Sequence, residues 1–205
     1  MVSSTQQLIL ESGKRWFLEK GFKSAPLRSI VKDTGFTPGA FYGYYKTKEE
    51  LFYALTDETA EGLVSIVQSI GEEMEALPPE RMLYEMVDCY IRRLPELVGY
   101  LCEHREEMQL ILRCSEGTKY ENFLDLFRMR NREFLKQATE QANRAGKQVH
   151  GLPPETYELL MRGYFHMLSL IVLEEEEPEK ICRMMEQIAL VYKNGMLSLM
   201  EEGEQ

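Results

Sequence analysis

Apolar residues recur at helical spacing along almost the whole chain, and no stretch alternates between apolar and polar residues as a half-buried strand would. Strong helix formers such as Leu, Glu, Met, Lys and Arg fill the segments between glycine and proline breakers. The fold class that this pattern predicts is all-α. Taking the breakers as helix ends predicts about nine helices, over about residues 5–20, 27–34, 38–44, 48 to beyond 70, 80–103 with a kink at Pro95, 105–114, 120–145, 154–173 and 179–200.

The last two predicted helices are apolar around their whole circumference instead of along one stripe. A helix of this kind is buried on more than one side. One side can contact the chain's own core and the other a second copy, as in a four-helix bundle built by two subunits. Burial of both helices at the centre of a monomer is the alternative. The residues expected at the dimer interface are Leu168, Ile171, Val172, Ile188 and Tyr192.

The net charge of −10 by itself argues against a nucleic-acid partner. Its distribution changes that view, because residues 1–50 hold eight Lys and Arg but only five Asp and Glu, a net charge of +3. The other 155 residues carry −13. A small basic end on an acidic body is typical of a protein that meets phosphates at one end. A solvated basic helix face would give the same asymmetry.

Several sequence features bear on the compartment. No stretch approaches the roughly 20 apolar residues needed to cross a bilayer, and the N-terminus lacks the basic region and apolar core of a secretory signal. The four cysteines, Cys89, Cys102, Cys114 and Cys182, are far apart and form no CxxC pair. We expect buried, reduced thiols and a cytoplasmic protein that does not act at a membrane.

Residues 27–45 carry a helix-turn-helix pattern. The short predicted helix over 27–34 is followed by Gly35, which can supply the left-handed conformation that commonly ends a helix. Thr37 can cap the next helix with its hydroxyl, and Pro38 suits the first helical position because its missing N–H would have had no partner there. Two short helices joined by a three-residue turn containing Gly are typical of a helix-turn-helix, although any helical hairpin could show this pattern.

The residues around this pattern closely resemble the N-terminal signature of the tetracycline-repressor (TetR) family. The resemblance covers about residues 5–55, and the segments that carry it are Trp16–Phe22, Ile30–Val31, Gly35–Tyr42 and Tyr44–Phe52. The remaining 150 residues are similar to the family only in helix number and in the apolar final pair.

This resemblance implies a sequence-specific transcriptional regulator, a repressor that binds double-stranded operator DNA as a homodimer and is released by a small-molecule inducer. It implies a DNA-binding domain in residues 1–50. The helix from about residue 48 would link it to a larger helical ligand-binding and dimerisation domain in residues 51–205.

Physical roles can be given to the matched positions. The start of the second short helix would face base edges in the major groove. Tyr42 offers a phenol to a phosphate, and Lys48 begins the long helix, where its ammonium and the N–H groups of the helix start could together hold another. A purely structural part, with Tyr42 in a core and Lys48 as a solvated helix start, is the alternative. The candidate DNA-binding residues are Arg28, Thr37, Pro38, Gly39, Ala40, Tyr42, Gly43, Tyr44, Lys46 and Lys48.

The larger domain contains side chains that could line a pocket for the inducer that the resemblance implies. Twelve methionines indicate an adaptable, polarizable interior. The same side chains could equally form an ordinary core. The candidate pocket residues are Met82, Met86, Tyr90, Met108, Phe127, Phe134, Tyr157, Met161 and Phe165.

Two other function classes compete with this interpretation. A di-iron helical bundle needs Glu-x-x-His, but none of the three histidines has a Glu three residues before it. The sequence also lacks zinc-ligand spacing, a glycine-rich phosphate loop and a nucleophile motif, so we expect no catalysis, metal or cofactor. A helical interaction protein, whose basic end binds an acidic protein instead of DNA, is the second alternative.

Overall fold

The computed structural model describes residues 4–202, and within them it confirms the all-α class. The helices are α1 (Ser4–Ser24), α2 (Leu27–Asp33), α3 (Pro38–Tyr42), α4 (Lys48–Glu75), α5 (Pro79–Glu103), α6 (Arg105–Arg113), α7 (Phe123–Arg144), α8 (Pro154–Glu174) and α9 (Pro178–Glu202). They follow the predicted helices in order, and α5 continues through Pro95. None of the helices in residues 4–202 combines the length and apolar character needed to cross a membrane.

The chain divides into two compact units, each described here by itself. Unit 1 extends to Gly62 and also includes His104–Phe123, so it contains α1, α2, α3, α6 and the first half of α4. Unit 2 consists of Leu63–Glu103 and the chain from Leu124 onward, so it contains the end of α4 with α5, α7, α8 and α9.

Aromatic side chains form the centre of unit 1. Phe17 and Phe52 are fully buried, and their rings, with that of Phe22, meet one another at centroid distances of 5.2–5.7 Å. The chain reaches Phe22 through Gly21, whose φ of 73° is a conformation that glycine adopts without steric cost. The backbone N–H of Phe22 then donates to the carbonyl of Cys114 at 2.8 Å, which ties the end of α1 to the residue that follows α6.

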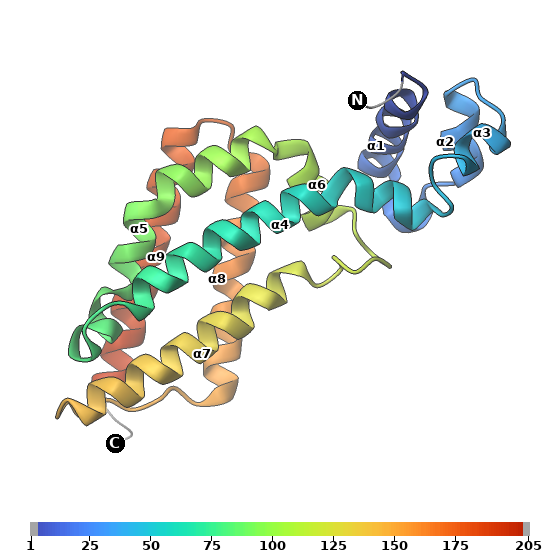
Figure 1. Ribbon diagram of the computed structural model, residues 1–205. Helices are drawn as coiled ribbons and strands as arrows, with labels where there is room; N and C mark the ends of the chain where they lie inside the picture. Colours follow the sequence, from blue (N-terminus) through green and yellow to red (C-terminus); the bar gives the residue numbers. More distant parts are fainter. Residues whose placement is uncertain (1–3, 203–205) are drawn as a thin grey trace. The chain divides into compact units, whose positions relative to one another are not determined.

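Helices α2 and α3 lie next to each other in unit 1 (Figure 1). Gly35, with a φ of 74°, makes the turn between them possible. Phe41 and Tyr45 are 1% and 5% exposed, which confirms the inward orientation that their spacing predicts. The pair of short helices therefore rests on the same core as α1, because Ser12 of α1 also donates from Oγ to the carbonyl of Ile30 at 3.0 Å.

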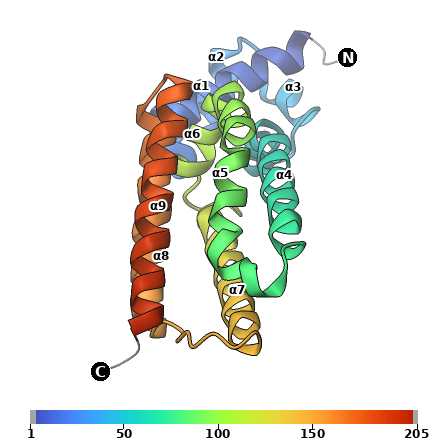
Figure 2. The same cartoon turned by 90° about the vertical axis from the view of Figure 1, so that its left-hand side faces the viewer.

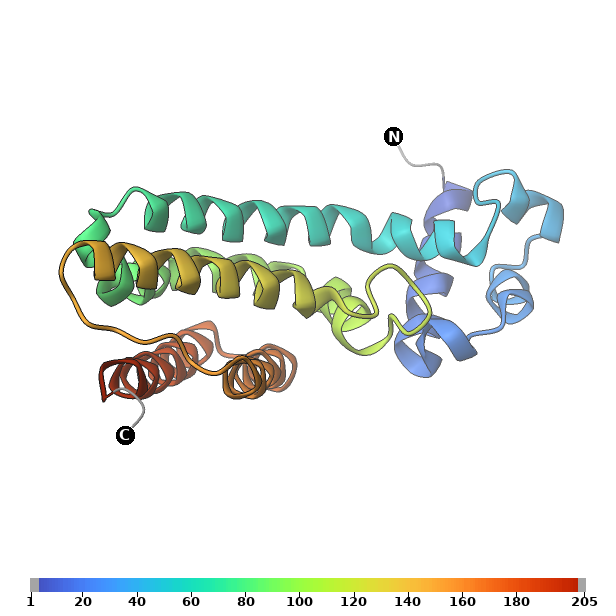
Figure 3. The ribbon, with the colours of Figure 1, turned by 90° about the horizontal axis from the view of Figure 1, so that it is seen from below.

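In unit 2, α8 and α9 run side by side, and α5 packs against α9 (Figure 2). The end of α4 approaches α7 closely (Figure 3). A Cβ at Gly71 would lie only 2.8 Å from Nη2 of Arg130 and 3.0 Å from the ring of Phe134. The absence of a side chain at Gly71 thus sets the spacing between these two helices.

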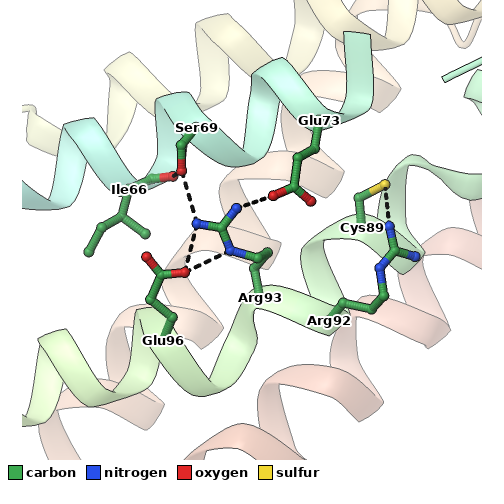
Figure 4. Close-up of polar contacts among 7 residues, drawn as sticks. All are labelled: Ile66, Ser69, Glu73, Cys89, Arg92, Arg93 and Glu96. Atoms are coloured by element: carbon green, nitrogen blue, oxygen red, sulfur yellow. Dashed lines mark hydrogen bonds and ion pairs between the residues drawn. The ribbon is translucent and has the colours of Figure 1, made fainter. Parts of the chain in front are cut away.

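A polar contact joins α4 to α5 on the surface of unit 2 (Figure 4). The guanidinium of Arg93 on α5 donates to Oγ of Ser69 at 3.0 Å and to Glu96 at 2.7 Å, and it also pairs with Glu73 on α4. The neighbouring Arg92 donates instead to Sγ of Cys89 on its own helix at 3.0 Å (Figure 4).

The four cysteines are free thiols, as expected from their spacing. Cys89 and Cys114 are buried, but Cys102 and Cys182 are only half-buried. The expectation of burial is therefore correct for one pair and wrong for the other, because Cys102 and Cys182 lie on helix faces that the core does not fully cover.

Candidate nucleic-acid interface

The start of α3 is fixed by Thr37 and Pro38. Thr37 has an extended backbone, and its Oγ1 accepts a hydrogen bond from the N–H of Ala40 at 3.4 Å, which confirms the predicted cap. Pro38 occupies the first helical position, where its fixed φ suits the helix. These two residues give the five-residue α3 a defined direction despite its short length.

Most of the candidate DNA-binding residues form an exposed surface on and beside α3. Tyr42 and Tyr44 are 55% and 42% exposed, whereas Ala40 is half-buried. The exposed positions that the sequence predicts for DNA contact are Arg28, Thr37, Pro38, Gly39, Tyr42, Gly43, Tyr44 and Lys46. The structure therefore brings together the predicted residues of α3 and its flanks as one accessible stretch.

Ion pairing within unit 1 decides which positive charges are available to a partner. Four basic residues of the first 50 are held by carboxylates at 2.5–3.0 Å: Lys14 by Glu106 and Glu107, Arg15 by Asp33, Lys20 by Glu19, and Lys23 by Glu116. Arg28, Lys32 and Lys46 are exposed and have no ion pair within residues 4–202. The available positive charge of the N-terminal segment is thus concentrated on α2 and just after α3.

Lys32 is a candidate that the sequence interpretation missed. It lies four residues after Arg28 on α2, and residues at this spacing share one face of a helix. The signal was present in the sequence, since both residues fall in the first helix of the helix-turn-helix. What distinguishes Lys32 from Lys14 and Lys23 is that the carboxylate partners of those two lysines lie about 90 residues further along the chain, where spacing in the sequence does not reveal them.

Lys48 lies at the start of α4, but its ammonium points back into unit 1. Its Nζ is 2.7 Å from the carbonyl oxygen of Phe22, 3.1 Å from that of Ala25 and 3.4 Å from that of Lys23. It also lies 4.4 Å from the centroid of the Phe22 ring. Burial lowers the pKa of this lysine, although the charge of Glu49 opposes the shift. The phosphate contact expected of Lys48 stays a prediction, and these contacts indicate another role.

Two N–H groups at and just before the start of α4 are also engaged. The N–H of Glu50 donates to Oγ1 of Thr47 at 3.1 Å, and the Glu50 carboxylate accepts from the N–H of Lys46 at 2.6 Å. This exchange resembles a capping box, in which a Thr and a Glu three residues later satisfy the donors of a helix start. The spacing Thr47-x-x-Glu50 can be read in the sequence, and our sequence interpretation overlooked it.

The candidate pocket residues are only partly brought together. The five that share one buried cluster of unit 2 are Met82, Met86, Phe134, Tyr157 and Met161. Phe127 and Phe165 are half-buried in the same unit. Met108 lies on α6 in unit 1 and is 2% exposed within the core of that unit, so it is not a member of this cluster.

Tyr90, the remaining candidate, carries an unusual hydroxyl. Its Oη is buried and has no hydrogen bond of ordinary geometry within residues 4–202, although the phenol of Tyr164 lies close enough to interact with it. Burial raises the pKa of Tyr90 well above its ordinary value, and the neighbouring phenol of Tyr164 adds to the shift. The pKa of Tyr164 is itself raised to about 12, mainly by burial, and its ring stacks on that of Tyr192 with centroids 4.9 Å apart. A buried donor without an acceptor is costly, which makes Tyr90 a candidate anchor for a ligand.

The residues predicted for the dimer interface differ in how far the single chain buries them. Ile171 and Val172 are 5% and 6% exposed within the single chain, so the fold already buries them. Leu168, Ile188 and Tyr192 are half-buried. The large apolar side chains that α8 and α9 leave exposed are Leu159, Leu170, Leu190, Val191 and Leu199. Periodicity showed that both helices are apolar all round but could not show which side the chain itself covers.

Comparison with known proteins relates the N-terminal residues, which include α2 and α3, to a protein family. Residues 9–55 match the model of the family described as bacterial regulatory proteins, tetR family. One relative, the HTH-type transcriptional repressor AcnR of Corynebacterium glutamicum, is 35% identical over 69 residues, which cover 34% of this chain and 37% of the relative. The AcnR of Corynebacterium efficiens is 33% identical over 81 residues, which cover 35% of this chain and 43% of the relative. The sequence match therefore spans well under half of either protein.

Solved structures resemble the chain over nearly its whole length. A TetR-like transcriptional regulator from a Rhodococcus species has a TM-score of 0.58 at 19% identity, covering 93% of this chain and 96% of its own. A member of the TetR transcriptional regulator family from Streptomyces coelicolor has a TM-score of 0.59 at 20% identity, covering 94% and 92%. At such identities the likeness shows the fold, and the N-terminal match adds the family. Residues 9–55 therefore match the tetR family of bacterial regulatory proteins, and the whole chain shares the fold of solved TetR-like regulators.

Proposed function

We propose that the chain is a transcriptional repressor that binds duplex operator DNA through α2 and α3. The observation that carries the proposal is the position of Arg28, Lys32 and Lys46. These are exposed cations without an intramolecular ion pair in residues 4–202, and they lie on α2 and just after α3. Cations that no carboxylate neutralises can replace the counterions of a phosphate backbone. Thr37 and Tyr42 add hydroxyl groups that can donate to phosphate oxygens.

The proposed base-facing surface consists of Pro38, Gly39, Ala40, Gly43 and Tyr44. These residues offer few side-chain hydrogen-bond donors to base edges. Contact with thymine methyl groups and recognition of DNA shape would then carry most of the sequence preference.

The rest of the chain would control when this surface binds. We propose that residues 51–205 form the dimerisation and ligand-binding domain, and that an inducer with unequal affinity for two conformations releases the repressor from DNA. The cluster containing Met82, Met86 and Met161, with the unsatisfied Tyr90 hydroxyl nearby in sequence, supports a ligand that is largely apolar and carries a hydrogen-bond acceptor. A repressor of this kind acts in the cytoplasm and catalyses no reaction.

Salt dependence of duplex binding tests the proposal. We call the DNA-binding part of one subunit, with α2 and α3, a head. Each phosphate that a cation neutralises contributes about −0.9 to the slope of log affinity against log salt, so three available cations should give a slope of about −2.7 per head. Binding of the full-length chain to a random duplex pool is measured between low and physiological salt, and the retained fragments are sequenced. A slope near zero with no enriched sequence would contradict DNA binding and favour an acidic protein as the partner.

A further inference from the structure

We infer that Lys48 is a positioning residue, which holds the junction between α1 and α2 in place and does not contact DNA itself. The inference rests on the proposed function, because what Lys48 would position is the cationic face of α2. It concerns a residue that the sequence suggested as a phosphate ligand. Three structural observations within unit 1 lead to this different role.

The first observation is that the hydrogen-bonding capacity of the ammonium is used. An ammonium has three donors, and Nζ of Lys48 is within 3.4 Å of three carbonyl oxygens, those of Phe22, Lys23 and Ala25. The carbonyls of Phe22 and Lys23 belong to the C-terminal end of α1, where the last turn of a helix leaves acceptors without partners, and that of Ala25 follows it. A cation is also favoured at this end by the helix dipole. The ammonium thus donates to carbonyl oxygens at and just after the end of α1.

The second observation is that the surroundings of the side chain favour this internal position. Nζ lies over the Phe22 ring, which belongs to the buried aromatic cluster with Phe17 and Phe52. Contact with an aromatic face adds to the stability of a partly desolvated cation. Reaching outward to a phosphate would require Lys48 to leave three acceptors and this ring at once.

The third observation is that the start of α4 offers little to an anion. Thr47 and the Glu50 carboxylate already accept from the N–H groups of Glu50 and Lys46. The first turn of α4 also carries two acidic residues, Glu49 and Glu50, which repel a phosphate. Part of the donor capacity at this helix start is therefore used within unit 1, and its carboxylates oppose the binding of a phosphate.

The consequence for DNA binding follows from where the acceptors lie. Ala25 is 2% exposed and immediately precedes Pro26, the residue that caps the start of α2. Fixing residues 22–25 therefore fixes the point from which α2 begins, and with it the direction of Arg28 and Lys32. Loss of the Lys48 contacts should misplace these cations without removing a DNA contact.

The test compares Lys48→Met with Lys46→Met in the full-length chain. Both changes remove one positive charge close to α3, so long-range electrostatics are matched. Duplex affinity is measured across a salt series at about 15 °C, well below the unfolding range of mesophile domains. Emission of Trp16, the single tryptophan, confirms that unit 1 is folded, since its Nε1 donates to Asp33 at 2.6 Å across α1 and α2.

We expect Lys46→Met to make the salt slope shallower by about 0.9 per head. Lys48→Met should weaken binding about tenfold at every salt concentration and leave the slope unchanged, because hydrogen bonds from a charged group are lost but no phosphate contact is. A shallower slope for Lys48→Met, equal to that of Lys46→Met, would overturn the inference while leaving DNA binding intact.

Lys48→Arg provides a second measurement that does not depend on how well the Met variant folds. A phosphate contact would tolerate Arg, which binds phosphate well. The space among three carbonyl oxygens is filled by a compact ammonium, so we expect Arg to weaken binding several-fold with the wild-type slope. Wild-type affinity in Lys48→Arg would overturn the inference. A wild-type chain that binds no duplex would instead overturn the proposed function, and the inference with it.

Discussion

Neighbouring aromatic residues on α3 have opposite environments. Phe41 is 1% exposed and anchors the helix, whereas the next residue, Tyr42, is 55% exposed and packs only its ring edge on Phe41, with centroids 5.5 Å apart. Burial of Phe41 therefore holds Tyr42 outward at little cost. An outward phenol on a short, well-anchored helix is a suitable donor to a phosphate oxygen.

Removing the Tyr42 hydroxyl should weaken DNA binding and leave the fold unchanged. We expect Tyr42→Phe to reduce duplex affinity about tenfold, which corresponds to the loss of one hydrogen bond to a charged group. The unfolding temperature should stay at the wild-type value, because the hydroxyl of the exposed Tyr42 has no hydrogen bond within residues 4–202. Titration of labelled duplex and thermal unfolding measure the two quantities. Tyr84→Phe, on α5 of unit 2, is the control and should leave affinity unchanged; equal affinities for all three proteins would rule out the Tyr42 contact.

Residues whose partners lie close in sequence were predictable. The Thr37 cap and the inward orientation of Phe41 and Tyr45 depend on neighbours within a few positions, and the sequence shows them directly. Lys48 was not predictable in this way, because its acceptors lie 23 to 26 residues earlier in the chain. Spacing shows where a charged side chain starts, but only the tertiary fold shows which acceptors it reaches.

At the scale of elements, the glycine and proline residues indicated where the helices begin and end. They did not indicate which helices contact one another. The contact of Arg93 with Ser69 and Glu73 joins α5 to α4, and nothing in the spacing of these residues indicates it. Helix α4 belongs to unit 1 at its start and to unit 2 at its end. A contact on its last turns is therefore a place where ligand binding in unit 2 could act on α4.

Breaking this contact should loosen the end of α4. We expect Arg93→Met to lower the unfolding temperature by about 2–4 °C, because a partly exposed ion pair and two hydrogen bonds contribute modestly in a domain of this size. Arg92→Met is the matched control, since Arg92 is adjacent on the same helix but donates to Cys89 of its own helix. Differential scanning calorimetry of both variants measures the effect. A control shift as large as that of Arg93→Met would show that the α4 contact contributes nothing specific.

At the scale of the whole molecule, α8 and α9 leave an apolar surface that a single chain does not cover. Leu159 and Val191 are 73% and 69% exposed, and Gly195, one turn after Val191, has nothing within 4 Å of where a Cβ would lie. Large apolar side chains that a monomer leaves exposed on one pair of helices favour an interaction site there. We propose that a second copy of the chain covers this surface, because two helix pairs can close into a symmetric four-helix bundle.

A charge at Val191 should therefore separate the subunits without unfolding them. We expect Val191→Glu to weaken dimer formation about a hundredfold or more, because an unpaired carboxylate would be buried at the interface. Its unfolding curve at low protein concentration should match that of the wild-type monomer, since the side chain is exposed within the single chain. Sedimentation equilibrium measures the association. Met129→Glu is the matched control, as Met129 is 71% exposed but lies on α7.

The Val191→Glu and Met129→Glu variants also test how dimer formation affects DNA binding. Two linked heads bind neighbouring half-sites with a steeper salt dependence than one, because each head neutralises its own phosphates. Val191→Glu should therefore halve the salt slope measured on the selected operator, whereas Met129→Glu should keep the wild-type slope. A Val191→Glu protein that remains dimeric would place the subunit interface elsewhere on the chain. A monomer that keeps the full slope would mean that one head alone neutralises all the phosphates, which three available cations cannot do.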